Sequence, residues 1–154
     1  MNQLKKGDKA PEIISKDQHG NEFRLSSLQG KKVVLYFYPK DDTPGCTAEA
    51  CNLRDNYSDL RAKGFEVLGV SPDSEKAHQK FITKYALPFT LLADPDKKIL
   101  NDYGVWGEKK MYGKPYMGVL RTTFIINEDG IIESVMEKVD TKNHTNQIFT
   151  ELSL

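Results

Sequence analysis

An unbroken apolar run at residues 33–38 constrains the fold more than any other feature of this chain. It reads Val-Val-Leu-Tyr-Phe-Tyr, with β-branched and aromatic side chains and no polar residue between them. A strand with one exposed face alternates apolar and polar residues, whereas a strand covered on both faces can be apolar throughout. The run therefore predicts a central strand of an α/β sheet, and Pro39 ends it because proline cannot continue the sheet hydrogen bonds.

Predicted strands and helices alternate along most of the chain around this central strand. Further strands are expected at residues 13–15, 22–25, 65–70, 90–93, 122–126 and 131–139. Helices are expected from about 46 to 63, 74 to 85, 96 to 103 and from 143 onward, and residues 104–118 are expected to form a glycine-punctuated loop. The first two strands form an N-terminal β-hairpin. The pattern predicts a thioredoxin-like α/β fold, in which helices flank a central mixed β-sheet on both faces.

The overall composition bounds the class of protein. The 154 residues favour a single domain spanning 1–154. Lys and Arg together number 22, as do Asp and Glu, which argues against a nucleic-acid partner. No apolar run approaches the length of a membrane span, and the N-terminal segment lacks the apolar core of a signal peptide. We therefore expect a cytoplasmic protein, where a pair of cysteines is more often catalytic or redox-active than structural.

Cys46 is the candidate nucleophile because of its position. It follows the central strand and a Pro-Gly turn, and a helix is expected to begin there. The first backbone N–H groups of a helix are unpaired and carry about half a positive charge, which stabilises a thiolate. Thr43 lies in the same turn and is expected either to donate to the thiolate or a bound oxygen, or to be an ordinary turn residue. Pro39 and Pro44 would stiffen this loop. The alternative for Cys46 is an inert buried cysteine.

Cys51 follows Cys46 by five residues on the same predicted helix. In an intact helix this spacing leaves the two α-carbons about 8–9 Å apart, whereas a disulfide needs them within about 7 Å. If the two cysteines form a disulfide, the start of the helix must unwind. The alternative is that Cys51 is an unrelated core residue.

Arg121 is the candidate cation of the site. It precedes the predicted strand at 122–126, which in a thioredoxin-like sheet lies beside the strand that leads into the cysteine loop. A guanidinium there would stabilise the thiolate and donate to a peroxide oxygen as the O–O bond breaks. The alternative is an exposed surface arginine.

Three acidic residues near Cys46 would disfavour the thiolate, since like charges repel. Asp41 and Asp42 are expected to point into solvent. Glu49 would either bond back to the start of the helix or pair with an arginine, and the sequence leaves both possibilities open.

Other sites are weakly indicated. The three histidines are scattered without metal-ligand spacing, and two cysteines do not complete a zinc site, which needs about four ligands. The loop glycines match no nucleotide-binding pattern, so we expect no cofactor and no metal. The lysines at 109, 110 and 114 are expected to be solvated. The aromatic residues at 106, 112 and 116 either line a surface near the site or simply pack.

These residues together resemble a known family. Pro39, Thr43 and Cys46 reproduce the Pro-xxx-Thr-xx-Cys signature of the peroxiredoxins, and Arg121 stands where that family keeps its active-site arginine. The segments at 45–51, 103–109 and 121–125 are similar to the Q-type subgroup, also called bacterioferritin comigratory proteins. The resemblance extends from about Gly7 to the final helix.

The resemblance implies a thioredoxin-like fold and the reduction of hydrogen peroxide and organic hydroperoxides. By this resemblance Cys46 matches the peroxidatic cysteine and Cys51 the resolving cysteine of members that carry one on the same helix. It also implies an intramolecular disulfide, recycling by thioredoxin or a similar dithiol protein, and a monomer.

The sequence is also compatible with two other functions. A thiol–disulfide oxidoreductase usually carries Cys-xx-Cys and a proline just before the strand that faces the cysteines. Here the cysteine spacing is Cys-xxxx-Cys, and Leu120-Arg121-Thr122 occupies the position before the strand. The second alternative is a non-enzymatic peroxide sensor.

Overall fold

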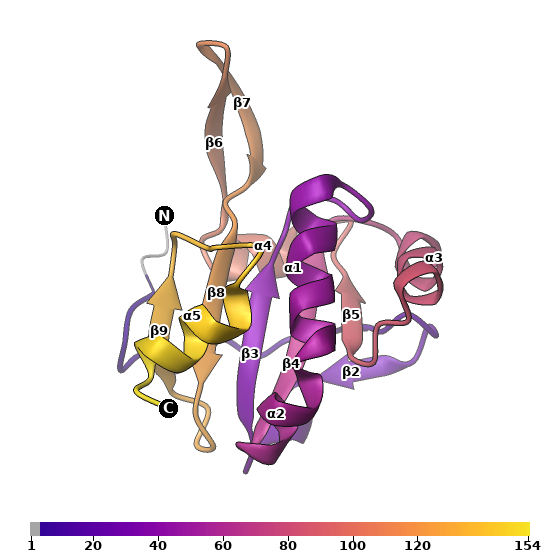
Figure 1. The fold of residues 1–154 in the computed structure, drawn as a ribbon. Helices are drawn as coiled ribbons and strands as arrows, with labels where there is room; N and C mark the ends of the chain where they lie inside the picture. The colour runs from indigo at the N-terminus through magenta and orange to yellow at the C-terminus, as the bar shows by residue number, and fades with distance from the viewer. Residues whose placement is uncertain (1–3) are drawn as a thin grey trace.

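A mixed β-sheet forms the centre of the molecule (Figure 1). The computed structural model describes residues 4–154, so the start of the N-terminal segment interpreted above lies outside the described residues. The sheet has seven strands, in the order β2 (Glu22–Arg24), β1 (Ile14–Lys16), β5 (Thr90–Ala93), β4 (Phe65–Ser71), β3 (Lys32–Phe37), β8 (Thr122–Ile126) and β9 (Ile132–Met136). The neighbours β3, β4 and β5 run parallel, and the other pairs are antiparallel.

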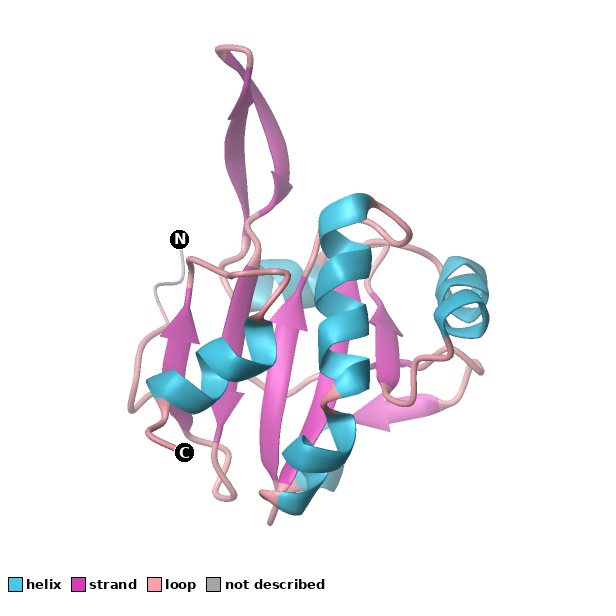
Figure 2. Ribbon diagram, in the orientation of Figure 1, coloured by secondary structure: helices cyan, strands magenta, loops and turns pink. Residues whose placement is uncertain are grey.

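Helices cover both faces of this sheet, as Figure 2 shows. One face packs against α1 (Pro44–Asp55), α2 (Tyr57–Ala62), α3 (Glu75–Tyr85) and α5 (His144–Glu151). The other face packs against the 3-10 turn η1 (Leu25–Leu28) and the short helix α4 (Lys98–Asp102). The predicted thioredoxin-like α/β architecture and its N-terminal hairpin are confirmed.

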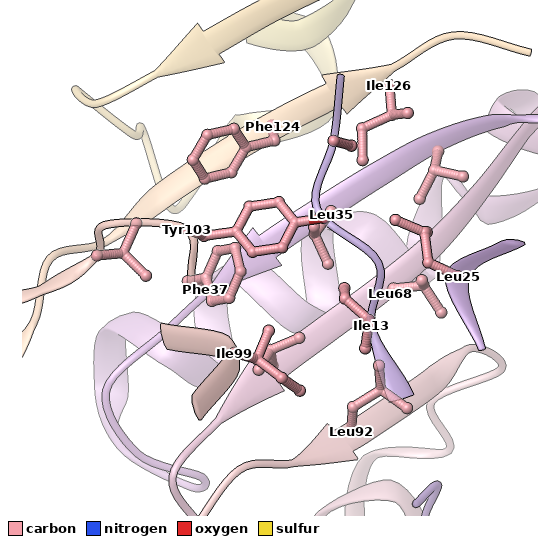
Figure 3. Packing of buried hydrophobic residues seen from close by; sticks show 14 of the residues in the cluster. Ile13, Leu25, Leu35, Phe37, Leu68, Leu92, Ile99, Tyr103, Phe124 and Ile126 are labelled. Carbon is pink, nitrogen blue, oxygen red and sulfur yellow. The ribbon is translucent and has the colours of Figure 1, made fainter. Parts of the chain in front are cut away.

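The central strand β3 supplies side chains to both cores. Val33, Leu35 and Phe37 belong to the core beneath α4, where Phe37 packs at 5.3 Å from the ring of Tyr103 (Figure 3). The residues between them, Val34 and Tyr36, and Tyr38 directly after the strand belong to the core beneath α1. Burying a large apolar side chain contributes about 1.5–3 kcal/mol, so this strand is held firmly from both sides. The prediction that the apolar run is covered on both faces is confirmed.

The helix expected at residues 46–63 is two helices. The first begins two residues earlier than expected, at Pro44, and the break lies at Asn56. Asn56 donates from its side-chain amide to the backbone oxygen of Asn52 at 2.8 Å. The backbone N–H of Asn56 bonds the same oxygen at 3.2 Å, and Asn56 has φ −111° and ψ 12°, outside the α-helical region, so the helix divides at this residue.

The expectation of a loop at 104–118 is wrong. These residues form a β-hairpin, β6 (Trp106–Met111) and β7 (Lys114–Val119), which projects from the body of the molecule (Figure 1). The turn residues Tyr112 and Gly113 have φ angles of 52° and 78°, which suit the two-residue turn of a tight hairpin. Most of the hairpin is exposed on both faces, so its sequence lacks the alternation that marks a half-buried strand.

The remaining elements lie close to their expected positions. Within residues 4–154, no helix has both the length and the apolar character needed to cross a bilayer.

Candidate active site

Cys46 lies in the first turn of α1, and its side chain is 1% exposed. Thr43 is the N-cap residue, and the first backbone hydrogen bond of the helix joins the N–H of Thr47 to the oxygen of Thr43 at 2.8 Å. The N–H groups of Gly45 and Cys46 therefore have no partner within the helix. The sulfur lies at the positive end of a helix, one turn further in than a cap position.

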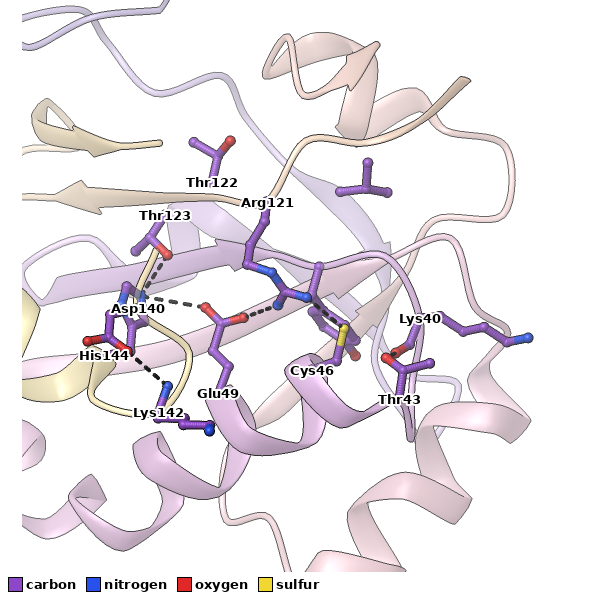
Figure 4. Close-up of polar contacts among 12 residues, drawn as sticks. Lys40, Thr43, Cys46, Glu49, Arg121, Thr122, Thr123, Asp140, Lys142 and His144 are labelled. Atoms are coloured by element: carbon purple, nitrogen blue, oxygen red, sulfur yellow. Dashed lines mark hydrogen bonds and ion pairs between the residues drawn. The ribbon is translucent and has the colours of Figure 1, made fainter. Parts of the chain in front are cut away.

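Arg121 connects two parts of the site (Figure 4). It precedes β8, which pairs with β3 so that Thr122 lies opposite Phe37 at the end of the central strand. This pairing brings Arg121 to the cysteine loop. Its Nη2 donates to the sulfur of Cys46 at 3.3 Å, and its Nη1 donates to Oε1 of Glu49 at 2.6 Å. Of the two arrangements left open for Glu49, the structure shows the pair with an arginine.

Glu49 is completely buried one turn beyond Cys46. Burial raises the pKa of Glu49 to about 7, although the pairing with Arg121 acts in the opposite direction. The pKa of Arg121 is lowered by burial but raised more by Glu49 and Cys46 together, so the guanidinium stays charged. The second carboxylate oxygen, Oε2, lies 3.6 Å from Nε2 of His144 and has no hydrogen-bond partner among the described residues.

The hydroxyl of Thr43 forms no hydrogen bond with the sulfur of Cys46. It donates to the backbone oxygen of Lys40 at 2.8 Å, which orients its lone pairs for accepting a hydrogen bond. Pro39 is half-buried where the loop leaves β3.

Gly45 has a role that the sequence did not indicate, because a β-carbon there would be 3.3 Å from Nη2 of Arg121. The glycine lets the guanidinium approach the helix.

The expected orientation of the two aspartates is wrong for Asp41. Its side chain is buried, where it accepts from the hydroxyl of Tyr38 at 2.5 Å and lies 2.6 Å from Nδ1 of His78. Asp42 is largely exposed, as expected. It pairs with Lys84 at 2.7 Å, and the hydrogen bond from Lys84 lowers the pKa of Asp42. Neither carboxylate forms a hydrogen bond with Cys46.

Asp41, Asp73 and His78 form a cluster that their sequence spacing did not indicate. Their ligand atoms lie within 4.8 Å of one another. Each already has partners, since Asp73 accepts from Ser71 at 2.7 Å and Nε2 of His78 lies 3.1 Å from the backbone oxygen of Leu92. Hydrogen bonding explains this cluster, which fastens the cysteine loop to β4, β5 and α3.

Cys51 is a half-buried free cysteine on α1, and Cys46 is also free. The helix between them is intact, so their α-carbons are about 8–9 Å apart. The next residue, Asn52, holds the helix in place. Its side chain accepts from the N–H of Thr145 at 2.8 Å and donates to the backbone oxygen of Lys142 at 3.1 Å. A disulfide therefore requires unwinding of the turns that precede Asn52.

The fold and the site together define a thioredoxin-fold protein with a cysteine and an arginine at the start of a helix. Comparison with known proteins narrows this class. The model of the AhpC/TSA family matches residues 6–135. Peroxiredoxin Bcp of Escherichia coli is 45% identical over 152 residues, which cover 99% of this chain and 97% of the relative. Peroxiredoxin Bcp of Bacillus subtilis is 44% identical over 146 residues, covering 95% and 93%.

Solved structures agree with these relatives. A cysteine-to-serine mutant of Xylella fastidiosa PrxQ superimposes with a TM-score of 0.91 at 29% identity, over 99% of this chain and 98% of that chain. A cysteine-to-serine mutant of Xanthomonas campestris peroxiredoxin Q gives 0.85 at 33% identity, over 92% and 90%. The chain belongs to the AhpC/TSA family, and its Bcp and PrxQ relatives confirm the predicted peroxiredoxin, a thiol peroxidase.

Proposed function

We propose that Cys46 is the peroxidatic cysteine of this thiol peroxidase and that it reduces hydrogen peroxide and organic hydroperoxides. The observation that carries the proposal is the guanidinium of Arg121 bound to the sulfur of Cys46 at the N-terminus of α1. A cation and unpaired helix N–H groups on one sulfur favour the thiolate, which is the nucleophilic form.

In the first step the thiolate attacks the terminal peroxide oxygen in line with the O–O bond. An S–O bond forms, the O–O bond breaks, and negative charge develops on the leaving oxygen. Arg121 and the N–H groups of Gly45 and Cys46 stabilise this charge, while the Thr43 oxygen accepts from the peroxide O–H. The leaving oxygen takes up a proton and departs as water or alcohol, and Cys46 becomes a sulfenic acid.

In the second step the thiol of Cys51 attacks the sulfur of the sulfenic acid. The S–S bond forms as the S–O bond breaks, and water leaves. Two observations support this role for Cys51: it lies on the same helix as Cys46, and the next residue, Asn52, fixes the helix beyond the turns that must open. Opening those turns breaks the contacts of Cys46 and Glu49 with Arg121. A reduced thioredoxin or a similar dithiol protein then opens the disulfide by thiol exchange, in which its own thiols are oxidised.

Separate substitutions of the two cysteines test these roles. Peroxide consumption is followed with thioredoxin, its reductase and NADPH as the electron source. We expect Cys46→Ser to abolish turnover. Cys51→Ser should keep one rapid oxidation per molecule, detected as a sulfenic acid by a dimedone adduct in mass spectrometry, but lose sustained turnover. A thioredoxin-dependent rate in Cys51→Ser equal to that of the wild type would overturn its resolving role.

The same assay separates the enzyme from a peroxide sensor, which would be oxidised once without sustained consumption of peroxide.

Since the proposed disulfide forms within one chain, the reaction requires no second copy of the protein, and we further propose a cytoplasmic monomer. Sedimentation of the reduced and oxidised protein tests the monomer, and cell fractionation tests the location. A reversible shift to a disulfide-linked dimer on oxidation would contradict the proposed monomer.

A further inference from the structure

Two buried titratable groups behind Arg121 have no part in the peroxidase steps above. Glu49 and His144 are both fully buried, on α1 and α5, and their Oε2 and Nε2 atoms lie 3.6 Å apart (Figure 4). Oε1 of Glu49 accepts from Nη1 of Arg121, the terminal nitrogen that is not bonded to the sulfur of Cys46. The protonation state of the pair therefore decides how much negative charge competes with the thiolate for Arg121.

Hydrogen bonds around His144 fix which ring nitrogen carries the proton. Gln147 donates from its amide nitrogen to the backbone oxygen of Lys138 at 2.6 Å and accepts from the N–H of Asp140 at 2.9 Å. Its Oε1 is thus the atom 2.9 Å from Nδ1 of His144, so Nδ1 donates. In a neutral ring, Nε2 then presents a lone pair, which accepts from the Thr123 hydroxyl at 2.8 Å.

Oε2 of Glu49 faces the same lone pair and has no donor among the described residues. A buried carboxylate oxygen without a donor is costly, because its hydration is lost and nothing replaces it. One proton on the pair removes the uncompensated charge, whether it lies on the carboxyl group or on the imidazole. In either case the pair is electrically neutral.

We propose that Glu49 and His144 share one proton in the reduced enzyme, and that this proton leaves the positive charge of Arg121 available to the Cys46 thiolate. The proposal rests on the peroxidase function proposed above. His144 is a positioning residue, because it acts on the sulfur only through Glu49 and Arg121. Loss of the shared proton adds a buried negative charge beside the thiolate and disfavours it.

The other groups around the pair do not replace this proton. The titratable and charged side chains that surround it are Cys46 on α1, Arg121 before β8, Tyr36 on β3 and Asp140 before α5. Among these described side chains Arg121 is the one cation, and it is shared with the sulfur. Burial raises the pKa of Glu49 to about 7, whereas burial lowers the pKa of His144. Both directions favour a proton on the carboxyl group at neutral pH and its loss above that range.

Glu49→Gln provides a matched probe, since its side chain has the shape and hydrogen-bonding pattern of a protonated glutamate. Its carbonyl oxygen can accept from Arg121, and its amide nitrogen takes the place of the protonated oxygen that lies 3.6 Å from Nε2 of His144. We measure the rate of the reduced protein with hydrogen peroxide from pH 6 to 8.5. The ratio of the Glu49→Gln rate to the wild-type rate should rise by about tenfold across that range, because only the wild type gains a charge. A ratio that stays constant would overturn the proposal.

His144→Ala, made in both backgrounds, separates positioning from a purely structural role. In the wild-type background it should shift the pH at which the rate changes, and in the Glu49→Gln background it should leave the shape of the pH profile unaltered. Equal effects on the two profiles would mean that His144 only supports the packing of α5.

A spectroscopic measurement tests the proton without relying on activity or on the variants with His144 removed. Infrared difference spectra of the reduced protein between pH 6 and 8.5 should show either the carbonyl band of a protonated carboxyl group, absent in Glu49→Gln, or the imidazolium bands of His144. Absence of both at pH 6 would refute the shared proton even in a fully active enzyme. Their presence in an inactive protein would leave the proton in place and refute the peroxidase assignment instead.

Discussion

At the scale of single residues, the site depends on how closely Arg121 approaches the helix that carries Cys46. Gly45 makes this approach possible, because a β-carbon at that position would be 3.3 Å from Nη2. Arg121 has little freedom to move aside, since its two terminal nitrogens are bound to Cys46 and Glu49. The smallest side chain at position 45 is thus part of the geometry of the site.

The substitution Gly45→Ala separates stability from activity. Alanine is favoured over glycine within a helix by about 1 kcal/mol, but displacing Arg121 from the buried Glu49 opposes this gain, so the free energy of unfolding should change little or fall. The displaced guanidinium should slow the reaction with peroxide by about tenfold or more, since small misplacements in an active site are costly. Stopped-flow kinetics and urea unfolding measure the two effects. A rate equal to that of the wild type would show that Arg121 does not act at the observed distance.

Sequence alone indicated some residues of the site and missed others for identifiable reasons. Cys46 and Arg121 were found because the strand and helix pattern placed them at adjacent strand ends, where the structure brings them together. The burial of Asp41 was not foreseen, because its partner His78 comes from a different element. His144 carried no signal, since it lies far along the chain and joins the site only through the packing of α5 on α1.

At the scale of elements, α1 must be stable at one end and able to unwind at the other. The proposed disulfide requires the turns between Cys46 and Cys51 to open, while Asn52 binds the backbone at the start of α5. This contact also supplies the cap that Asn143, the N-cap residue of α5, does not provide with its own side chain. We infer that Asn52 marks the boundary of unwinding.

Hydrogen exchange on the oxidised protein tests this boundary. In the wild type, the amides of residues 47–55, whose acceptors are the oxygens of residues 43–51, should lose protection on oxidation. The amides from Asn56 onward, whose first acceptor is the oxygen of Asn52, should keep it. In Asn52→Ala the loss should extend into α2, and stability should fall by about 1 kcal/mol, as for a lost helix cap. Asn101→Ala is the control, because its amide bonds a helix carbonyl of α4 outside the site. The boundary is refuted if both variants resemble the wild type.

Burial of the individual elements explains why most of them could be predicted from the sequence and the β6–β7 hairpin could not. The buried strands β3, β4 and β8 have runs of apolar residues that mark them directly. The hairpin is stabilised by its own ladder and a tight turn at Tyr112 and Gly113, and little of it is buried. Local hydrogen bonding leaves no hydrophobic pattern, so the glycines were the only visible signal and suggested a loop.

At the scale of the whole molecule, the two hydrophobic cores lie on opposite faces of one sheet and share the strand β3. We propose on this ground that the chain is a single domain. The site draws on distant parts of the sequence, with Cys46 on α1, Arg121 before β8 and His144 on α5. Because the sheet holds all three in place, the site exists only in the folded protein.

The most direct test of the account is the rate at which the fully reduced protein reacts with hydrogen peroxide, compared with free cysteine at the same pH. The folded site should accelerate the reaction by several orders of magnitude, and the acceleration should vanish in Cys46→Ser and in protein unfolded by urea. Organic hydroperoxides are measured in parallel. A rate like that of free cysteine with every peroxide would contradict the central claim that Arg121 and the start of α1 activate Cys46.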